Sequence, residues 1–438
     1  MNKTKTPVTI IGGGLAGTEA AYQLANAGFQ VTLYEMRPLK MTPAHKSSFL
    51  SELVCSNSLK SESLNTASGL LKQELKYLHS IVIQTAEKNR VPAGNSLAVD
   101  REKFAEELTR IITNHDNINI IRKEMTDIPS NRPLVIATGP LTSDTFSEAI
   151  KQLTPGGLFF YDAIAPVVSA DSIDFNHCFF KSRYDKGPPD FLNCPLSEEK
   201  FKIFYNELMK AEKVELKDFE DKSVFEACMP IEEMAERGEK TLTFGPLKPV
   251  GLQHPETGRK YYAVLQLRKE NREGTAYNLV GCQTKMKIPE QKRVFRLIPA
   301  LRNAEFLKYG TIHRNTYINS PKYLDTNYKL KEKYIYFAGQ ITGVEGYIES
   351  VASGITVALD IIHRYYTEKS LTLPKTTALF ALQNYTKNYG EEFVPSNFHF
   401  GLLPRLDKKI KDKKIKKEYM SKRALSDLEK FIKELPWN

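Results

Sequence analysis

The feature that most constrains the fold of this chain is a glycine-rich turn close to its N-terminus. Gly12, Gly14 and Gly17 match the pattern GxGxxG directly after a short apolar run. A helical pattern over 18–28 and a strand pattern over 30–34 follow, which predicts a parallel βαβ unit. In such a unit the glycines permit a tight turn, close approach of a pyrophosphate, and packing of the helix on the strand. The turn therefore predicts a Rossmann-type dinucleotide-binding fold.

Two further features of this unit fit a bound dinucleotide. Glu35 ends the second predicted strand, where a carboxylate binds ribose hydroxyls. The helix after the turn would offer free N–H groups and the positive end of its dipole to a phosphate. We therefore predict that Glu35 and the whole turn bind the cofactor. The residues of the turn are Gly12, Gly13, Gly14, Leu15, Ala16 and Gly17.

Two more short strands that end in glycine favour FAD over NAD as the tightly held cofactor. The runs 133–139 and 334–339 end at Gly139 and Gly339. Both resemble the distal FAD-contacting segments of flavoproteins that bind two dinucleotides. A helix is predicted just after the second run, and its N-terminus would stabilise the negative charge of a reduced flavin.

The pattern of the sequence changes between about residues 150 and 330, where Gly–Pro pairs separate mixed strand and helix segments. A chain of 438 residues accommodates two or three domains. We predict an α/β fold with a discontinuous FAD-binding domain of the glutathione-reductase type, formed by residues 1–150 and 330–438. A mixed α/β insertion domain, residues 151–329, is expected to interrupt it.

Composition argues against several classes of protein. The longest apolar runs fall well short of the ~18 residues of a membrane helix, and no signal peptide is recognised, so we expect a cytoplasmic protein without membrane contact. The five cysteines are sparse and include no CxxC, which predicts no metal site and no disulfide-linked partner.

The net charge of +10 favours an anionic partner, above all nucleic acid. Two basic segments are candidates for phosphate contacts, although a solvated helix face explains the C-terminal one nearly as well. The first segment comprises Lys285, Lys287, Lys292, Arg293 and Arg296. The second, C-terminal segment comprises Lys408, Lys409, Lys411, Lys413, Lys414, Lys416 and Lys417.

Two cysteines are candidates for catalysis. Cys55 lies in the polar segment SELVCSNS, and Cys228 lies in FEACMP. A lone cysteine is more often a small buried hydrophobe than a nucleophile, so the residues alone leave both interpretations open. A reactive thiol needs cationic help. Arg37, His45, Lys46 and Lys60 lie near Cys55 in the sequence and could supply this charge, although each is more often a solvated surface group.

Several long segments identify a family. The chain resembles the bacterial folate- and FAD-dependent tRNA uracil-5 methyltransferases (TrmFO) over nearly its whole length. The matching segments are GGGLAGTEAAYQLANAGFQVTLYEMRP (12–38), TPAHKSSFLSELVCSNSLKSE (42–62), VFEACMPIEEMAERGEKTLTFGPLKPVGL (224–252), NREGTAYNLVGCQTKMKIPEQKRVFRLIP (271–299), YIYFAGQITGVEGYIESVASG (334–354) and FHFGLLPRL (398–406).

The resemblance implies an activity and its co-substrates. The family forms 5-methyluridine in the T loop of tRNA, with 5,10-methylenetetrahydrofolate as the methylene donor. NADH or NADPH supplies the reducing equivalents through FAD. Three other functions remain open: the same chemistry on a uridine of 23S ribosomal RNA, a non-catalytic RNA-binding flavoprotein, and a small-molecule flavin oxidoreductase.

The resemblance also implies site residues. Cys55 and Cys228 correspond to the two cysteines that carry the family's chemistry, and Tyr347 is expected beside the flavin. We expect Cys55 to add to C6 of the uracil and Cys228 to remove the C5 proton, with the reverse assignment open. Because the two thiols belong to different predicted domains, the site is expected at the domain interface. The remaining cysteines, Cys178, Cys194 and Cys282, are expected to be structural.

Overall fold

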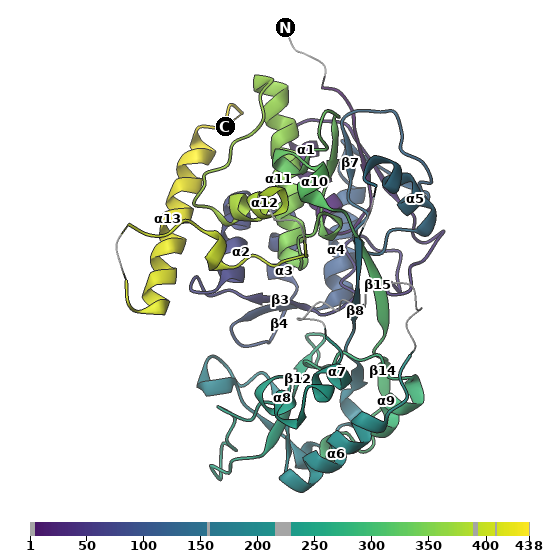
Figure 1. Cartoon of the computed structure of the whole chain (residues 1–438), viewed down its shortest axis with the longest axis vertical. Coiled ribbons are helices and arrows are strands. Elements are labelled where there is room, and N and C mark those ends of the chain that lie inside the picture. Colours follow the sequence, from purple (N-terminus) through teal and green to yellow (C-terminus); the bar gives the residue numbers. More distant parts are fainter. Residues whose placement is uncertain (1–4, 156–157, 215–228, 389–392, 408–409, 438) are drawn as a thin grey trace.

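A parallel sheet forms the frame of the upper part of the molecule in Figure 1. The computed structural model describes residues 5–155, 158–214, 229–388, 393–407 and 410–437. Within them the sheet has the order β16-β7-β1-β2-β6, and every neighbouring pair is parallel. Its strands are β1 (Val8–Ile11), β2 (Val31–Glu35), β6 (Ile118–Arg122), β7 (Leu134–Ile136) and β16 (Ile335–Phe337).

The pairing of β7 joins the two ends of the chain in one sheet. Leu134 pairs with Thr9 on one side and with Ile335 on the other. The strands predicted near residues 8, 30, 133 and 334 are therefore present, and each central strand is a short, buried apolar run, as expected for a sheet covered on both faces.

Helices cover this sheet (Figure 1). The first begins at Leu15 and not at Thr18 as predicted, because the N–H of Thr18 already donates to the carbonyl of Gly14 at 2.9 Å. The helices of this part are α1 (Leu15–Asn26), α2 (Ala67–Tyr77), α3 (Ile81–Lys88), α4 (Arg101–Thr113), α5 (Asp144–Leu153), α10 (Ser320–Tyr323), α11 (Tyr347–Thr367), α12 (Ala378–Asn388) and α13 (Lys413–Lys433).

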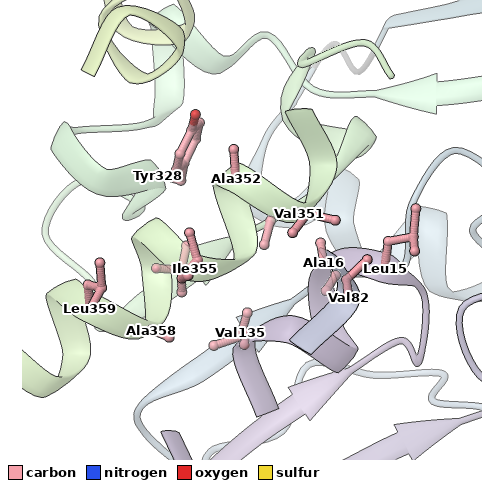
Figure 2. Packing of buried hydrophobic residues seen from close by; sticks show 14 of the residues in the cluster. Leu15, Ala16, Val82, Val135, Tyr328, Val351, Ala352, Ile355, Ala358 and Leu359 are labelled. Atoms are coloured by element: carbon pink, nitrogen blue, oxygen red, sulfur yellow. The ribbon is translucent and has the colours of Figure 1, made fainter. Parts of the chain in front are cut away.

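Close packing of α1 against α11 fixes the positions of the loops that follow β1 and β16. Figure 2 shows Ala16 of α1 beside Val351 of α11 within the buried cluster. A Cβ on Gly354 would lie 2.3 Å from the carbonyl oxygen of Ala16, so this glycine permits the close approach of the two helices. The N-termini of both helices consequently lie at the same edge of the sheet, next to the ends of β1 and β16.

A second sheet lies in the lower part of the molecule (Figure 1). Its described strands have the order β10-β11-β12-β13-β9-β14 and pair in antiparallel fashion. They are β9 (Val167–Ser169), β10 (Phe179–Phe180), β11 (Leu192–Leu196), β12 (Ala263–Lys269), β13 (Ala276–Leu279) and β14 (Phe306–Lys308). The helices of this part are α6 (Glu198–Lys210), α7 (Ile231–Glu236), α8 (Glu239–Phe244) and α9 (Ile288–Phe295).

The strands of the second sheet alternate between two faces. Leu265, Leu267 and Leu279 point into a hydrophobic core that is separate from the core of the first part. Their neighbours in the strands, such as Arg268 and Asn278, belong to the opposite face because successive side chains in a strand alternate. We refer to this as the outer face of the second sheet.

Two smaller sheets lie where the parts meet. The antiparallel pair β8 (Leu158–Ala163) and β15 (Ile312–Tyr317) runs from one part to the other in Figure 1. A three-stranded sheet of β3 (Ser58–Ser61), β5 (Ser96–Val99) and β4 (Arg90–Val91) faces the lower part. The polar, serine-rich segment 36–66 therefore contains a short strand, β3. The domain boundaries near residues 150 and 330 stay a prediction.

None of the helices in the described residues combines the length and the apolar character that a membrane span requires.

Candidate active site

A cavity opens at the carboxyl ends of β1, β2, β7 and β16, the position where open parallel sheets bind ligands. The space within it and at its solvent-open mouth is about 1000 Å³, and it extends to the first turn of α11. Nine of the ten residues predicted to bind the cofactor line it, and only Gly17 does not. The nine are Gly12, Gly13, Gly14, Leu15, Ala16, Glu35, Gly139, Gly339 and Tyr347.

The glycines of the opening turn have different functions. A Cβ on Gly17 would lie 1.9 Å from the carbonyl oxygen of Gly12, so Gly17 permits the packing of α1. Gly12 has a φ of +106°, which favours glycine. A Cβ on Gly14 would meet no atom within 4 Å and would enter the cavity. Because α1 begins at Leu15 without a side-chain cap, its first N–H groups remain available to an anion.

Glu35 holds the turn as well as lining the cavity. One carboxylate oxygen accepts the N–H of Gly13 at 3.0 Å, and the other accepts the backbone N–H and the Nε of Arg37, each at 3.0 Å. Burial acts to raise the pKa of Glu35, but the hydrogen bonds and charge of Arg37 outweigh it and leave the pKa lowered. Glu35 is therefore a buried carboxylate beside the position predicted for a ribose.

Gly139 and Gly339 follow β7 and β16, and both have left-handed φ angles, +67° and +84°. A Cβ on Gly139 would meet no atom within 4 Å. A Cβ on Gly339 would lie 3.1 Å from the Cβ of Ala16, and its N–H donates to Ser353 Oγ at 2.6 Å. The chain thus turns sharply after each strand and leaves the edge of the cavity open.

Tyr347 connects this cavity with Cys55. It is the first residue of α11 and lines the cavity. Its hydroxyl oxygen accepts the backbone N–H of Cys55 at 2.8 Å and that of Ser56 at 3.1 Å. Cys55 itself does not line the cavity, although Glu52 and Val54 do. The half-buried thiol of Cys55 thus belongs to a loop that borders the cavity.

Polar side chains from both parts of the molecule hold this Cys55 loop, residues 53–57. Arg101 of α4 donates to the carbonyl oxygens of Leu53 and Val54 at 3.1 and 3.4 Å, and its Nε lies 2.6 Å from Glu270. Lys308 of β14 donates to the carbonyl oxygen of Val54 at 2.8 Å. The loop is therefore in direct contact with the second sheet.

The other end of the loop is held in the same way. Asn57 is fully buried, and its Nδ2 donates to the carbonyl oxygens of Val99 at 3.1 Å and Lys269 at 2.9 Å. Arg268 of β12 donates through Nε to Asn57 Oδ1 at 2.8 Å and through Nη2 to Ser56 Oγ at 2.7 Å. These contacts place Cys55 between the two parts of the molecule.

The cations around Cys55 differ from those that its sequence neighbours suggest. Arg101, Arg268 and Lys308 interact electrostatically with the thiol. Arg37 is instead bound to Glu35, and Lys60 lies 3.8 Å from a carboxylate oxygen of Glu349. Burial, reinforced by Arg37, lowers the pKa of His45 to about 4, so its ring is neutral at pH 7. The contacts of the described residues thus favour Arg101, Arg268 and Lys308 over Arg37, His45 and Lys60 as the cations beside the thiol.

The sequence offered two weak signals for the residues it missed. Arg268 is a charged residue directly after the apolar positions of β12, and Asn57 follows Cys55 by two residues. Neither pattern indicates that the two side chains meet, because they are far apart in the chain and only the packing of β12 against the loop brings them together.

The remaining cysteines lie in different surroundings. Cys194 and Cys282 are buried in the core of the second part, and burial raises the pKa of both. Burial also raises the pKa of Cys178 to about 12. These three thiols are protonated at neutral pH. Cys228 lies outside the described residues, so its catalytic assignment stays a prediction.

Most members of the basic run on the second part already have acidic partners. Lys285 pairs with Glu233, Lys287 with Glu212 at 2.8 Å, and Arg293 with Glu290 at 2.7 Å. In the C-terminal segment, α13 packs through Met420, Ala424 and Leu428, which leaves its first-turn lysines exposed. The C-terminal segment is thus the better candidate for a phosphate contact. Lys408 and Lys409 lie outside the described residues.

Solved structures resemble this chain in fold. GidA from Aquifex aeolicus superposes with a TM-score of 0.73 in one crystal form and 0.72 in another. The match covers 99% of this chain and 74% or 76% of GidA at 15% sequence identity, so it concerns the fold alone. It supports the Rossmann-type α/β architecture that the glycine turn predicts.

Sequence comparisons show the family. The family model described as glucose inhibited division protein A matches residues 7–369. A protein of Natranaerobius thermophilus named methylenetetrahydrofolate--tRNA-(uracil-5-)-methyltransferase TrmFO is 56% identical over 97% of this chain and 99% of its own length. The Aquifex aeolicus protein of the same name is 57% identical over 98% of this chain and 97% of its own length. The chain therefore belongs to the glucose inhibited division protein A family and, within it, to the TrmFO proteins.

Proposed function

We propose that this protein is a methylenetetrahydrofolate- and FAD-dependent tRNA (uracil-5-)-methyltransferase that forms 5-methyluridine in the T loop. Likeness to the TrmFO proteins over nearly the whole chain supports the activity. One structural observation carries it: Tyr347 lines the glycine cavity and accepts the backbone N–H of Cys55, so a candidate thiol nucleophile borders a dinucleotide site.

The residues of the cavity fit FAD. The open space at Gly14 and the uncapped start of α1 suit a pyrophosphate, and Glu35 suits a ribose. Gly139, Gly339 and the start of α11 would border the flavin. When bound, FAD would supply the electrons that convert the folate-derived methylene group into a methyl group. NADH or NADPH would be the reductant.

The two thiols would activate the base. The thiolate of Cys55 adds to C6 of the uracil, which places an electron pair at C5 for bonding to the one-carbon unit. Cys228 then takes the C5 proton, the electron pair of the C5–H bond re-forms the C5–C6 double bond, and the bond between sulfur and C6 breaks with its electrons leaving on the thiolate. The reverse assignment gives the same balance. The RNA base must be flipped out of its stack to reach the thiol.

The proposal extends to organisation and location. Two separate hydrophobic cores support an FAD-binding domain of residues 1–150 and 330–438 and an insertion domain of residues 151–329. The site between them would receive the RNA, with the exposed lysines of α13 as candidate phosphate contacts. The protein would act in the cytoplasm, where tRNA, folate and nicotinamide cofactors are present together.

Labelled methylenetetrahydrofolate tests this function directly. The protein is incubated with it, with NADH or NADPH, and with unmodified tRNA or 23S ribosomal RNA. We expect label in 5-methyluridine of the tRNA T loop. Label only in ribosomal RNA would move the activity to that substrate. RNA binding without label would favour a non-catalytic flavoprotein, and folate-independent NAD(P)H oxidation would favour a small-molecule oxidoreductase.

A substrate analogue assigns the two thiols. Fluorine at C5 cannot leave as a proton, so tRNA with 5-fluorouridine at the target position should retain the bond between sulfur and C6. Peptide mapping of the adduct then identifies the nucleophile. We expect the RNA on Cys55, whereas an adduct on Cys228 would reverse the two roles.

A further inference from the structure

The outer face of the second sheet carries a row of four side chains, three of them polar, beneath the Cys55 loop. Lys308 pairs with Val167, Val167 with Asn278, and Asn278 with Arg268. Residues directly opposite one another in neighbouring strands share a face, and adjacent strands lie about 4.8 Å apart. The row therefore crosses four strands on the face opposite the hydrophobic core.

The two ends of this row contact the loop on either side of Cys55. Lys308 donates to the carbonyl oxygen of Val54 at 2.8 Å, and Arg268 donates to Ser56 Oγ at 2.7 Å. Because Cys55 lies between Val54 and Ser56 in the chain, we expect the middle of the row to lie beneath Cys55. The two middle positions belong to Val167 and Asn278, and only Asn278 is polar.

Asn278 has an unused hydrogen-bond donor. Its side chain is 4% exposed, and its buried Nδ2 atom has no hydrogen-bond partner. Such a group costs about 1–3 kcal/mol, so natural proteins rarely keep one without a reason. An N–H donor between two cations is suited to an anion, and the nearby group that becomes an anion is the Cys55 thiol.

The charge of the row is not cancelled by the hydrogen bonds that its ends make. Those of Arg268 and Lys308 go to neutral oxygens of the loop. Arg101, by contrast, forms an ion pair with Glu270. The titratable or charged groups that interact with the thiol are Arg101, Arg268, Lys308 and Tyr347. The charge of Glu270 acts on all three cations, and that of Glu52 acts on Lys308.

We propose that Arg268, Asn278 and Lys308 are positioning residues that stabilise the ionised form of Cys55, so that contact with the second sheet activates this thiol. The inference rests on the proposed role of Cys55 in methyl transfer. It places the activating groups in the second part of the molecule and the nucleophile in the first. Loss of contact between the parts would consequently lower the reactivity of Cys55.

Alkylation of Cys55 tests this without folate or RNA. Iodoacetamide labelling of the full-length flavoprotein is followed by peptide mass spectrometry, and the rate at about pH 7 is divided by that at about pH 10, where thiols are ionised. The ratio corrects for changes in access. We expect Arg268→Gln and Lys308→Met each to lower it about tenfold, and Asn278→Leu about threefold.

Two controls separate this effect from unfolding. Lys202→Gln removes an exposed cation of α6 that pairs with Glu198, and its ratio should equal that of the wild type. Cys194 and Cys282 are buried and should stay unlabelled in every folded variant. Asn278→Leu removes an unpaired buried donor, so its melting temperature should be unchanged or higher.

Unchanged ratios in Arg268→Gln and Lys308→Met would overturn the proposal. Labelling of Cys194 in those variants would show that they are unfolded. The labelling ratio of Asn278→Leu then decides, and a wild-type ratio in that variant would likewise contradict the proposal. The proposed methyl transfer is tested separately. Wild-type protein that labels as expected but forms no 5-methyluridine would refute the function and leave the thiol activation intact.

Discussion

The glycine-lined cavity and the Cys55 loop are neighbours, yet they are built in different ways. The cavity depends on the backbone: Gly12, Gly17 and Gly339 allow atoms to approach closely where a side chain would collide. The Cys55 loop depends on side chains: Arg101 and Lys308 reach its backbone from distant segments, and its own Asn57 reaches the backbone of Lys269. A cofactor site can therefore be formed by residues close in the sequence, while the reactive loop beside it requires contacts from distant parts of the chain.

The largest effect should come from the cavity. Gly17→Ala places a methyl group 1.9 Å from the carbonyl oxygen of Gly12. We expect this clash to lower the free energy of unfolding by about 4 kcal/mol and to release the bound flavin. Gly14→Ala is the matched control, because its methyl group meets open space and its φ of −77° suits alanine. It should keep its melting temperature and weaken only flavin binding, measured by absorbance. Equal stability of the two variants would contradict this account.

Glu35→Gln should have the next largest effect. It breaks a buried contact with Arg37, which costs about 3 kcal/mol of stability at neutral pH. Because the pKa of Glu35 is lowered on folding, its contribution is present above the ordinary glutamate pKa and is lost as pH falls below it. Urea unfolding at several pH values should show wild type and variant converging in acid. A difference in stability between wild type and variant that widens in acid would contradict the lowered pKa of Glu35.

Asn57→Leu should have a smaller effect on stability and a selective effect on function. The substitution leaves Arg268 Nε and two backbone carbonyl oxygens without this partner, and we expect a loss of about 2 kcal/mol. Flavin content should stay at the wild-type level, because Asn57 does not line the cavity. Methyl transfer should fall. Loss of flavin in this variant would indicate that the cavity and the loop are not independent.

The same contrast explains what the sequence could predict. The sequence predicts the βαβ unit, Glu35 and the strand ends at Gly139 and Gly339, because each depends on residues a few positions apart. Arg101, Arg268 and Lys308 were missed because their proximity to Cys55 depends on how two sheets pack. The cations chosen instead, such as Arg37, were neighbours in the chain that had other partners in space. The helix start at Leu15 was missed because the first turn of α1 belongs to the glycine motif itself.

A comparison of two single cysteine variants tests the central claim that Cys55 reacts at the edge of the flavin cavity. Cys55→Ala and Cys178→Ala are assayed for label transfer from methylenetetrahydrofolate to tRNA at equal flavin content. We predict that Cys55→Ala lowers methyl transfer by about a thousandfold or more with its flavin and melting temperature retained, whereas Cys178→Ala stays near wild type. Wild-type turnover by flavin-loaded Cys55→Ala would contradict the account.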